Sequence, residues 1–290
     1  MNQGVIVKGI AGFYYVKIET GEVIECKARG KFRKSKLTPL VGDKVSINMI
    51  DELHGSIEEI HERKSLLIRP NVANVDQAVV VFALKNPDLN YTFLNKVLMA
   101  IEHYEIDSLI CLNKADLDEG EFENAKAIYE KIGYEVLKIN ALTGEGLSEL
   151  KERLKGKISV FAGPSGVGKS TISNSVQENV VMETGGLSKK ISRGKHTTRH
   201  AQLIEISKDT YIVDTPGFSS IDLSFIKPSD LQYVFKEFKL GNCKFTSCMH
   251  NKEIGCAVKE DVENGVIPRE RYEAYINILQ ELETNKRGNR

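Results

Sequence analysis

At positions 163–170 the sequence reads Gly163-Pro164-Ser165-Gly166-Val167-Gly168-Lys169-Ser170, which matches the phosphate-loop pattern G-x-x-x-x-G-K-[ST] at every fixed position. The apolar run 158–161 before it predicts a strand, and a helix can begin at Thr171. In that setting the backbone N–H groups of residues 163–171 can converge on phosphate oxygens, and the helix N-terminus adds a favourable dipole. Lys169 is expected to reach the β- and γ-phosphates, and Ser170 to bind Mg²⁺. The motif by itself leaves ATP and GTP open.

Strands and helices alternate on both sides of this loop. The run Ala78 to Leu84 is continuously apolar, as in a buried parallel strand. Leu94, Val97, Leu98 and Ile101 follow at helical spacing and predict one apolar helix face. Further strands are expected at 108–112, 135–139, 158–161, 203–206 and 211–213. The pattern indicates an α/β domain with a mostly parallel sheet.

A guanine-specificity motif follows the strand at 108–112. Asn113-Lys114-Ala115-Asp116 resembles the N-K-x-D motif of the GTPase superfamily. The Asp116 carboxylate can accept hydrogen bonds from guanine N1–H and N2–H₂, and adenine has no matching pair of donors. Leaving buried acceptors unpaired is costly, which favours GTP over ATP. Asn140-Ala141 stands where the loop behind the guanine ring is expected, although the superfamily usually has Ser-Ala there.

The third nucleotide motif is Asp214-Thr215-Pro216-Gly217, which resembles D-x-x-G and follows the strand at 211–213. Asp214 would hold Mg²⁺ through water, and the Gly217 N–H would sense the γ-phosphate. Ordinary GTPases have the phosphate loop first and N-K-x-D late, whereas here the order is 113, 163, 214. Domain termini commonly lie close together, so a circular permutation of one sheet accounts for this order.

The first 68 residues predict a different kind of domain. Five short strands, at 5–10, 13–18, 23–28, 44–50 and 56–60, are separated by glycine turns and suggest a small closed barrel of the oligonucleotide-binding (OB) type. A basic run on a predicted barrel hairpin contains Lys27, Arg29, Lys31, Arg33, Lys34 and Lys36, and a second contains Lys189, Lys190, Arg193, Lys195 and Arg199. Both suit contacts with RNA phosphates, or are solvated loops. Arg69-Pro70-Asn71 is interpreted as a linker.

The C-terminal part predicts helices around a metal site. Leu231, Val234, Phe235 and Phe238 form one apolar stripe, and a charged helix ends the chain. Between them, Cys243, Cys248, His250 and Cys256 supply the Cys₃His ligand set of a structural Zn²⁺ site. The alternative is unrelated buried thiols and a surface histidine. Cys26 and Cys111 are expected in the core. The predicted domains are a barrel at 1–68, a permuted GTPase domain at 69–221 and a zinc-binding helical domain at 222–290.

The bulk composition is that of an ordinary globular protein, with 41% hydrophobic and 28% charged residues. Lys plus Arg equals Asp plus Glu at 40 each, so net charge excludes no class of partner. No apolar run approaches the ~18 residues of a membrane span. Five cysteines, three of them clustered beside a histidine, suit a reducing compartment. We therefore expect a cytoplasmic monomer that does not bind membranes.

Taken together, the permuted motifs, the small barrel and the cysteine cluster resemble the bacterial small ribosomal subunit biogenesis GTPases, the RsgA/YjeQ family. The resemblance extends to Gly4-Val-Ile-Val-Lys8, Gly12-Phe-Tyr-Tyr-Val16, Arg69-Pro70 and Asn74-Val-Asp76-Gln77. It implies GTP hydrolysis stimulated by the small ribosomal subunit, late in maturation of that subunit, with the barrel and zinc domains on ribosomal RNA.

The resemblance also suggests which groups act on the attacking water. Phe218 follows D-x-x-G where many GTPases have a glutamine, and it cannot form a hydrogen bond. His196, in Gly194-Lys195-His196-Thr197-Thr198, resembles the switch-loop motif of the family, which usually has Arg in place of Lys195. A neutral imidazole could orient the water, although a loop histidine could instead contact only RNA. Lys169, His196 and Thr198 are the catalytic candidates, and Thr198 is preferred to Thr197 as the Mg²⁺ ligand.

Two other functions are consistent with parts of the sequence. A phosphate-loop kinase would need an acceptor site and would not need N-K-x-D. An RNA-binding module could hold the nucleotide without hydrolysing it. Hydrolysis of GTP and ATP, with and without small ribosomal subunits, distinguishes the three.

Overall fold

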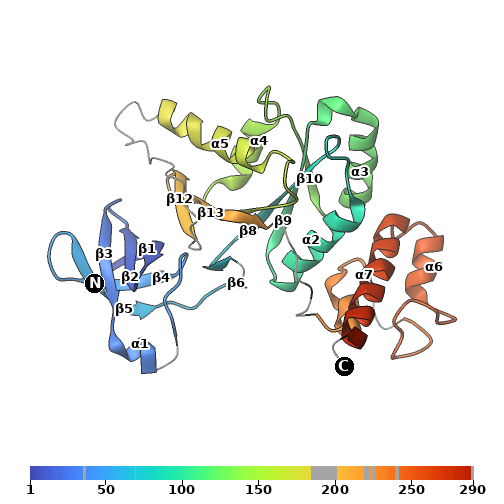
Figure 1. Ribbon diagram of the computed structural model, residues 1–290, viewed down its shortest axis with the longest axis horizontal. Coiled ribbons are helices and arrows are strands. Elements are labelled where there is room, and N and C mark those ends of the chain that lie inside the picture. The colour runs from blue at the N-terminus through green and yellow to red at the C-terminus, as the bar shows by residue number, and fades with distance from the viewer. Residues whose placement is uncertain are drawn as a thin grey trace. The chain divides into compact units, whose positions relative to one another are not determined.

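The computed structural model describes residues 1–34, 37–68, 70–183, 201–218, 223, 226–238 and 242–288 (Figure 1). The chain forms two compact units. The first contains residues 1–79, 147–161 and 170–218, and the second contains residues 80–146, 162–169 and 219–290. Each unit is therefore assembled from segments that are distant in sequence.

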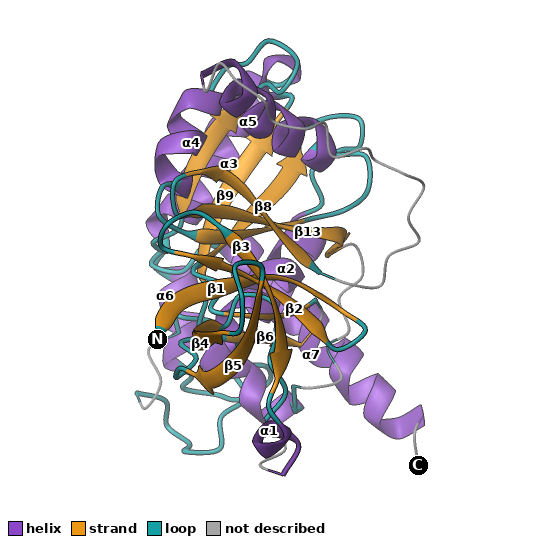
Figure 2. Cartoon of the chain, turned by 90° about the vertical axis from the view of Figure 1, so that its left-hand side faces the viewer, coloured by secondary structure: helices purple, strands orange, loops and turns teal. Residues whose placement is uncertain are grey.

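Five strands form a closed barrel in the first unit (Figure 2). They are β1 (Asn2–Ile10), β2 (Phe13–Ile18), β3 (Val23–Ala28), β4 (Lys44–Met49) and β5 (His54–Ile60). The barrel closes because β1 pairs with β4 as well as with β2, and β3 pairs with β5. Alternate side chains such as Ile6, Val16 and Ile57 are buried, as a period of two requires. The predicted barrel is confirmed.

Two short elements differ from the sequence expectation. The basic run, predicted on a hairpin, continues from β3 into a short helix, α1 (Gly30–Lys34). Of the predicted linker, Pro70 lies in a turn and Asn71 begins β7 (Asn71–Ala73), which pairs antiparallel with β6 (Leu66–Ile68) in a hairpin, while Arg69 lies outside the described residues. Asn74 holds this hairpin on the barrel, since its Oδ1 accepts from Lys64 N at 2.9 Å and its Nδ2 donates to Gly42 O at 2.9 Å. These are contacts between distant residues, so local pattern does not show them.

The first unit also contains the strands and helices around the phosphate loop. These are α4 (Leu147–Leu154), β11 (Ile158–Ala162), α5 (Lys169–Glu183), β12 (Gln202–Ser207) and β13 (Thr210–Phe218). β12 and β13 pair antiparallel. Lys8 of β1 pairs with Gln202 of β12, which joins the barrel directly to this hairpin.

The second unit carries the strand order β10–β9–β8. Its elements are β8 (Gln77–Ala83), α2 (Tyr91–His103), β9 (Asp107–Asn113), the 3-10 turn η1 (Ala115–Leu117), α3 (Glu119–Lys131) and β10 (Glu135–Ile139). β9 and β10 are parallel, and every residue of β8 is buried, as its apolar run predicts. The boundary between the units passes through β8 and β11.

The C-terminal segment of this unit consists of η2 (Pro228–Val234), α6 (Ala257–Glu263) and α7 (Arg269–Gly288). η2 is a 3-10 helix that begins at Pro228, so the predicted apolar stripe is not one α-helix. Phe235 and Phe238 are nevertheless buried, with ring centroids 5.3 and 4.9 Å from that of Tyr275 on α7. The mainly helical C-terminal fold is confirmed. None of the helices in the described ranges is long and apolar enough to span a membrane.

A buried arginine, Arg271, attaches α7 to the helices α2 and α3 of the second unit. Arg271 is fully buried, and its Nε donates to Glu237 Oε1 at 2.6 Å. Its Nη1 donates to Asn95 Oδ1 on α2 at 2.7 Å, and the Tyr129 hydroxyl of α3 donates to the same oxygen at 3.0 Å. A buried charge needs such partners because desolvation is expensive. The C-terminal segment is therefore fixed to α2 and α3 by an interaction that tolerates little displacement.

Candidate functional site

The phosphate loop adopts a conformation that three of its positions reserve for glycine. Gly163, Gly166 and Gly168 have φ of +135°, +82° and +98°. A Cβ on Gly163 would lie 2.1 Å from Val81 O, and one on Gly168 would lie 2.3 Å from Asn113 Nδ2. The loop thus packs directly against the ends of β8 and β9.

Lys169 lies inside the loop that precedes it. Its Nζ donates to Gly163 O at 2.9 Å and to Pro164 O at 2.5 Å. Burial lowers the pKa of Lys169 because it disfavours the charged form. The cation therefore occupies the centre of the loop, where a bound phosphate would supply both negative charge and acceptors.

Asn113, the last residue of β9, joins two loops through its side chain. Its Nδ2 donates to Val167 O of the phosphate loop at 2.8 Å, and its Oδ1 accepts from Ala141 N at 3.1 Å. The next residue, Lys114, is left-handed with φ of +59°, and its Nζ donates to Asn86 O and to Gly166 O, the latter at 3.4 Å. The sequence-predicted residues 113–116, 140–141 and 163–169 are thus brought together in the second unit.

The base-recognition candidates differ in exposure. The Asp116 side chain, on η1, is exposed, whereas Asn140 is buried with 6% of its surface exposed. Asn140 Nδ2 donates to Asp116 Oδ1 at 2.8 Å. The loop behind the guanine site thus contacts the candidate base ligand Asp116 through the Asn140 side chain, and its backbone contacts Asn113 through Ala141 N.

The remaining nucleotide candidates lie in the first unit or outside the described residues. Ser170 and Thr171 stand exposed in the first turn of α5. Asp214 is exposed on β13, opposite Gln202 of β12, and Gly217 lies in the same strand. His196, Thr197 and Thr198 lie outside the described residues, as does the second basic run.

The cysteine cluster has the geometry of a tetrahedral metal site. The ligand atoms of Cys243, Cys248, His250 and Cys256 all lie within 4.8 Å of one another. His250 Nδ1 is 3.5 Å from Cys243 Sγ and 3.4 Å from Cys256 Sγ. Zn–S bonds of about 2.3 Å and Zn–N bonds of about 2.0 Å place tetrahedral ligands about 3.5–3.8 Å apart. The four residues therefore fit Zn²⁺.

Gln232 completes this centre, and sequence reasoning missed it. Its Oε1 lies 2.8 Å from His250 Nε2, so Nε2–H donates to it and the Nδ1 lone pair faces the three sulfur atoms. Burial raises the pKa of the Cys248 thiol to about 12, so thiolates are favourable there only beside a cation. No spacing rule links Gln232 to the cluster, because it lies on η2 before the first cysteine.

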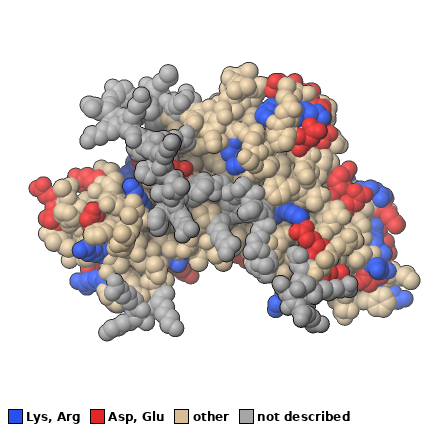
Figure 3. Space-filling view, viewed as in Figure 1, with Lys and Arg blue, Asp and Glu red and all other residues tan. Residues whose placement is uncertain are grey.

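The first basic run has structural partners as well as exposed charge. Arg29 Nη1 lies 2.7 Å from Oε2 of the buried Glu58, and Lys27 lies over the Phe13 ring at 4.9 Å from its centroid. Lys31 is exposed over Phe32. The side chains of Arg33 and Lys34, and the whole of Lys36, lie outside the described part of the chain. On the described part of the face in Figure 3, Lys and Arg are interspersed with Asp and Glu.

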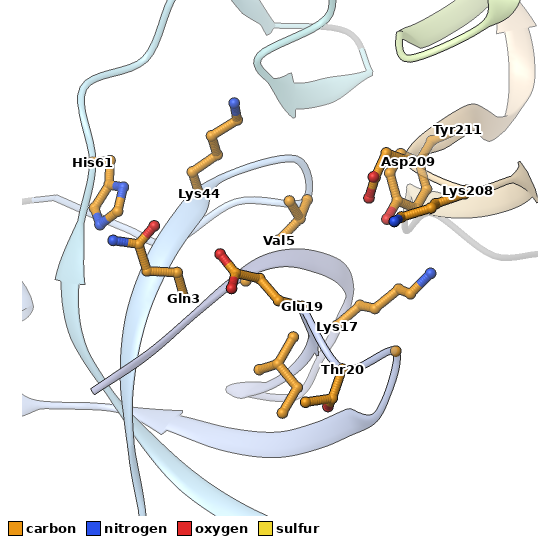
Figure 4. A pocket seen from close by; sticks show the side chains of 13 residues that line it. Gln3, Val5, Lys17, Glu19, Thr20, Lys44, His61, Lys208, Asp209 and Tyr211 are labelled. Atoms are coloured by element: carbon orange, nitrogen blue, oxygen red, sulfur yellow. The ribbon is translucent and has the colours of Figure 1, made fainter.

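A groove of about 520 Å³ lies within the first unit, between the barrel and the β12–β13 hairpin (Figure 4). Lys17, Glu19, Lys44 and His61 line it from the barrel, and Lys208, Asp209 and Tyr211 from the hairpin. It contains none of the predicted nucleotide residues. Its charges are mixed, so it has no single-sign ligand preference.

Comparisons with known proteins agree with this geometry. The RsgA N-terminal domain family matches residues 3–57, and the RsgA GTPase family matches residues 60–224. A small ribosomal subunit biogenesis GTPase RsgA of Clostridium perfringens strain 13 is 55% identical over 290 residues, covering 99% of this chain and 100% of that protein. The protein of that name from Caldanaerobacter subterraneus subsp. tengcongensis is 47% identical over 288 residues, covering 98% and 97%.

Two solved structures are similar along almost the whole chain. The crystal structure of YjeQ from Thermotoga maritima is 39% identical with a TM-score of 0.87, covering 97% of this chain and 98% of that one. The structure of YloQ, described as a circularly permuted GTPase, is 36% identical with a TM-score of 0.84, covering 98% and 96%.

Gly168→Ala is expected to abolish tight GTP binding because the added methyl group displaces Asn113. Gly166→Ala is the matched control, since its φ is also positive but no atom lies within 4 Å of the new Cβ. Backbone strain of about 1–2 kcal/mol predicts a loss of about tenfold for the control. The Gly168 variant should lose at least about tenfold more, measured by titration with a fluorescent GTP analogue. Equal losses in the two variants would contradict the proposed collision with Asn113.

Proposed function

This chain belongs to the RsgA family of small ribosomal subunit biogenesis GTPases, and from that premise we propose that the small ribosomal subunit itself stimulates its GTP hydrolysis, late in maturation of that subunit. The chain is a GTPase, and its family acts in biogenesis of the small subunit. The observation that supports GTP as the nucleotide is the convergence of the guanine motif and the phosphate loop on Asn113, and the role of the small subunit is supported by the relatives, which are named small ribosomal subunit biogenesis GTPases. A kinase would not need the guanine motif.

In this proposal, different residues bind the guanine base, the phosphates and Mg²⁺. Asp116 accepts hydrogen bonds from the guanine base, the loop at Asn140 and Ala141 covers that base, and residues 163–171 bind the phosphates. Lys169 provides the positive charge at the β- and γ-phosphates. Ser170, Asp214 and Thr198 would hold Mg²⁺, which neutralises phosphate charge when bound. Binding of Mg²⁺ is supported by the exposure of Ser170 and Asp214, because their side-chain oxygen atoms are ligands of the kind that Mg²⁺ prefers.

The attacking water needs a group other than residue 218. Phe218 has no hydrogen-bonding atom in its side chain, so we assign the orientation of water to His196. In the same switch segment Thr198 would respond to the γ-phosphate through Mg²⁺. Binding of the small subunit would bring His196 and Thr198 to the nucleotide and so raise the rate of hydrolysis.

The Cys₃His centre binds one structural Zn²⁺ in this proposal. The support is the spacing of the ligand atoms and the hydrogen bond that orients His250. A closed four-ligand set leaves no position for substrate, so the metal stabilises the fold of the segment and takes no part in hydrolysis.

Ribosomal RNA is the proposed partner of the barrel and the zinc domain. Exposed Lys31 and the other cations of the first basic run, Lys27, Arg29, Arg33, Lys34 and Lys36, would contact phosphates. Arg29 contributes least, because Glu58 already neutralises it. We keep the domain limits 1–68, 69–221 and 222–290, and a monomer in the cytoplasm, as parts of the same proposal.

Small ribosomal subunits are expected to stimulate hydrolysis of GTP and not of ATP. Phosphate release is measured for each nucleotide with the full chain alone, with purified small subunits and with large subunits as the matched control. Transfer of phosphate to a second substrate would instead indicate a kinase. Absence of turnover under every condition would indicate an RNA-binding module that holds the nucleotide without hydrolysing it.

His196→Ala is expected to lower the subunit-stimulated rate by about 10²–10⁴-fold, the range for a group that orients or deprotonates water. GTP affinity should remain nearly unchanged, because the imidazole would act on water and not on the nucleotide. His103→Ala, at the end of α2, is the control for loss of a histidine elsewhere. A stimulated rate equal to that of the unmodified chain would remove His196 from the mechanism.

Gln232→Leu is expected to weaken Zn²⁺ binding by about 10–100-fold, since the partner that orients the His250 ring is lost. Gln232→Glu is the matched control, because it retains an oxygen acceptor for His250 Nε2–H. Competition with a chromophoric chelator measures both affinities. Equal Zn²⁺ affinity in the leucine variant and the unmodified chain would show that Gln232 does not support the metal.

A further inference from the structure

The Asn140 side chain uses both ends of its amide in the guanine-side loop. Its Oδ1 accepts from Leu142 N at 3.0 Å and from Thr143 N at 3.2 Å. Its Nδ2 donates to Asp116 Oδ1 at 2.8 Å. The carbonyl oxygen of the amide already accepts hydrogen bonds from two backbone N–H groups. If the amide were reversed, its NH₂ group would face these two N–H donors. The NH₂ group is therefore fixed toward Asp116.

The loop that carries Asn140 is itself rigidly held. The Asn140 N–H donates to Glu145 O at 3.0 Å, and its carbonyl oxygen accepts from Gly144 N at 2.9 Å. Gly146 closes the loop against the backbone, because a Cβ there would lie 2.0 Å from Lys138 O. Asn140 is thus a buried donor, held by backbone hydrogen bonds, directly after β10.

Asp116, by contrast, is exposed and depends on this donor for its orientation. Among the described residues, the group that donates a hydrogen bond to the Asp116 carboxylate is the Asn140 amide. An exposed carboxylate without an anchor samples several rotamers, and fixing it in advance lowers the entropic cost of binding. Each carboxylate oxygen accepts more than one hydrogen bond, so the contact with Asn140 leaves both oxygens available to a base.

We propose that Asn140 is a specificity-determining positioning residue, whose side-chain amide holds the Asp116 carboxylate so that both oxygens face N1–H and the 2-amino group of guanine. This inference rests on the proposed role of Asp116 as the guanine ligand. Asn140 does not touch the base through its amide, so it acts on the choice of nucleotide through Asp116.

Asn140→Asp separates this role from a purely structural one. The aspartate keeps the oxygen that accepts from Leu142 N and Thr143 N, loses the donor, and places a like charge beside Asp116. GTP affinity is expected to fall by at least about tenfold, as for loss of a charge-assisted hydrogen bond. ITP lacks the 2-amino group, so its affinity should fall less and the preference for GTP over ITP should shrink.

A pH series supplies a second readout. Between two adjacent carboxyl groups, one pKa is raised, and protonation restores an O–H donor. The GTP affinity of the Asn140→Asp variant should therefore recover partly between about pH 8 and about pH 5.5. A variant with the GTP affinity and GTP-to-ITP preference of the unmodified chain, at all these pH values, would overturn the proposal.

Asp116→Ala is the control for the premise. If Asp116→Ala leaves the preference for GTP over ITP unchanged, the assignment of Asp116 as the guanine ligand fails. If Asp116→Ala changes this preference and Asn140→Asp does not, only the positioning role of Asn140 fails. Should Asn140→Asp not fold, as judged by circular dichroism, Asn140→Ser and Asn140→Ala are compared. A preference retained by serine and reduced in alanine supports the proposal, and an unchanged preference in both overturns it.

Discussion

The nucleotide site in the second unit depends on one side-chain amide, that of Asn113. It is buried at the end of β9, where it donates to the phosphate loop through Val167 and accepts from the loop at Ala141. Gly168 makes this possible, since any larger residue would occupy the position of the Asn113 amide. A parallel strand end, a phosphate loop and a base loop that are far apart in sequence thereby take up one arrangement.

A second polar centre plays the same part for the C-terminal segment. Arg271 brings a full positive charge into the interior, and Glu237, Asn95 and the face of the Phe235 ring surround it. The cysteine cluster lies in the same segment and shares its core with Phe238 and Tyr275. Because Arg271 and His250 are satisfied by partners outside their own elements, namely Glu237, Asn95 and Gln232, the segment has few alternative packings.

Much of this architecture is predictable from sequence, because strong periodicity and complete motifs fix local structure. The buried run of β8, the alternation in β1 to β5 and the glycines of the phosphate loop each have a local physical signature. Gln232, Arg271 and the side-chain role of Asn140 have none, because each depends on a partner brought close by the fold. The β6–β7 hairpin was missed since Pro70 marks a turn and a linker equally well. Sequence therefore predicts ligands better than it predicts what orients them.

The pairing of Lys8 with Gln202 has a consequence for the order in which the chain folds during its synthesis. The five strands of the barrel all lie within the first 60 residues. β1 can pair with β12 only after the intervening residues of the nucleotide-binding segments have been synthesised. Contacts of long sequence separation carry a larger loop-closure entropy and form late. During synthesis the barrel can therefore fold as a local unit at the ribosome exit. Its join to the hairpin that leads to Asp214 is completed among the last steps of folding.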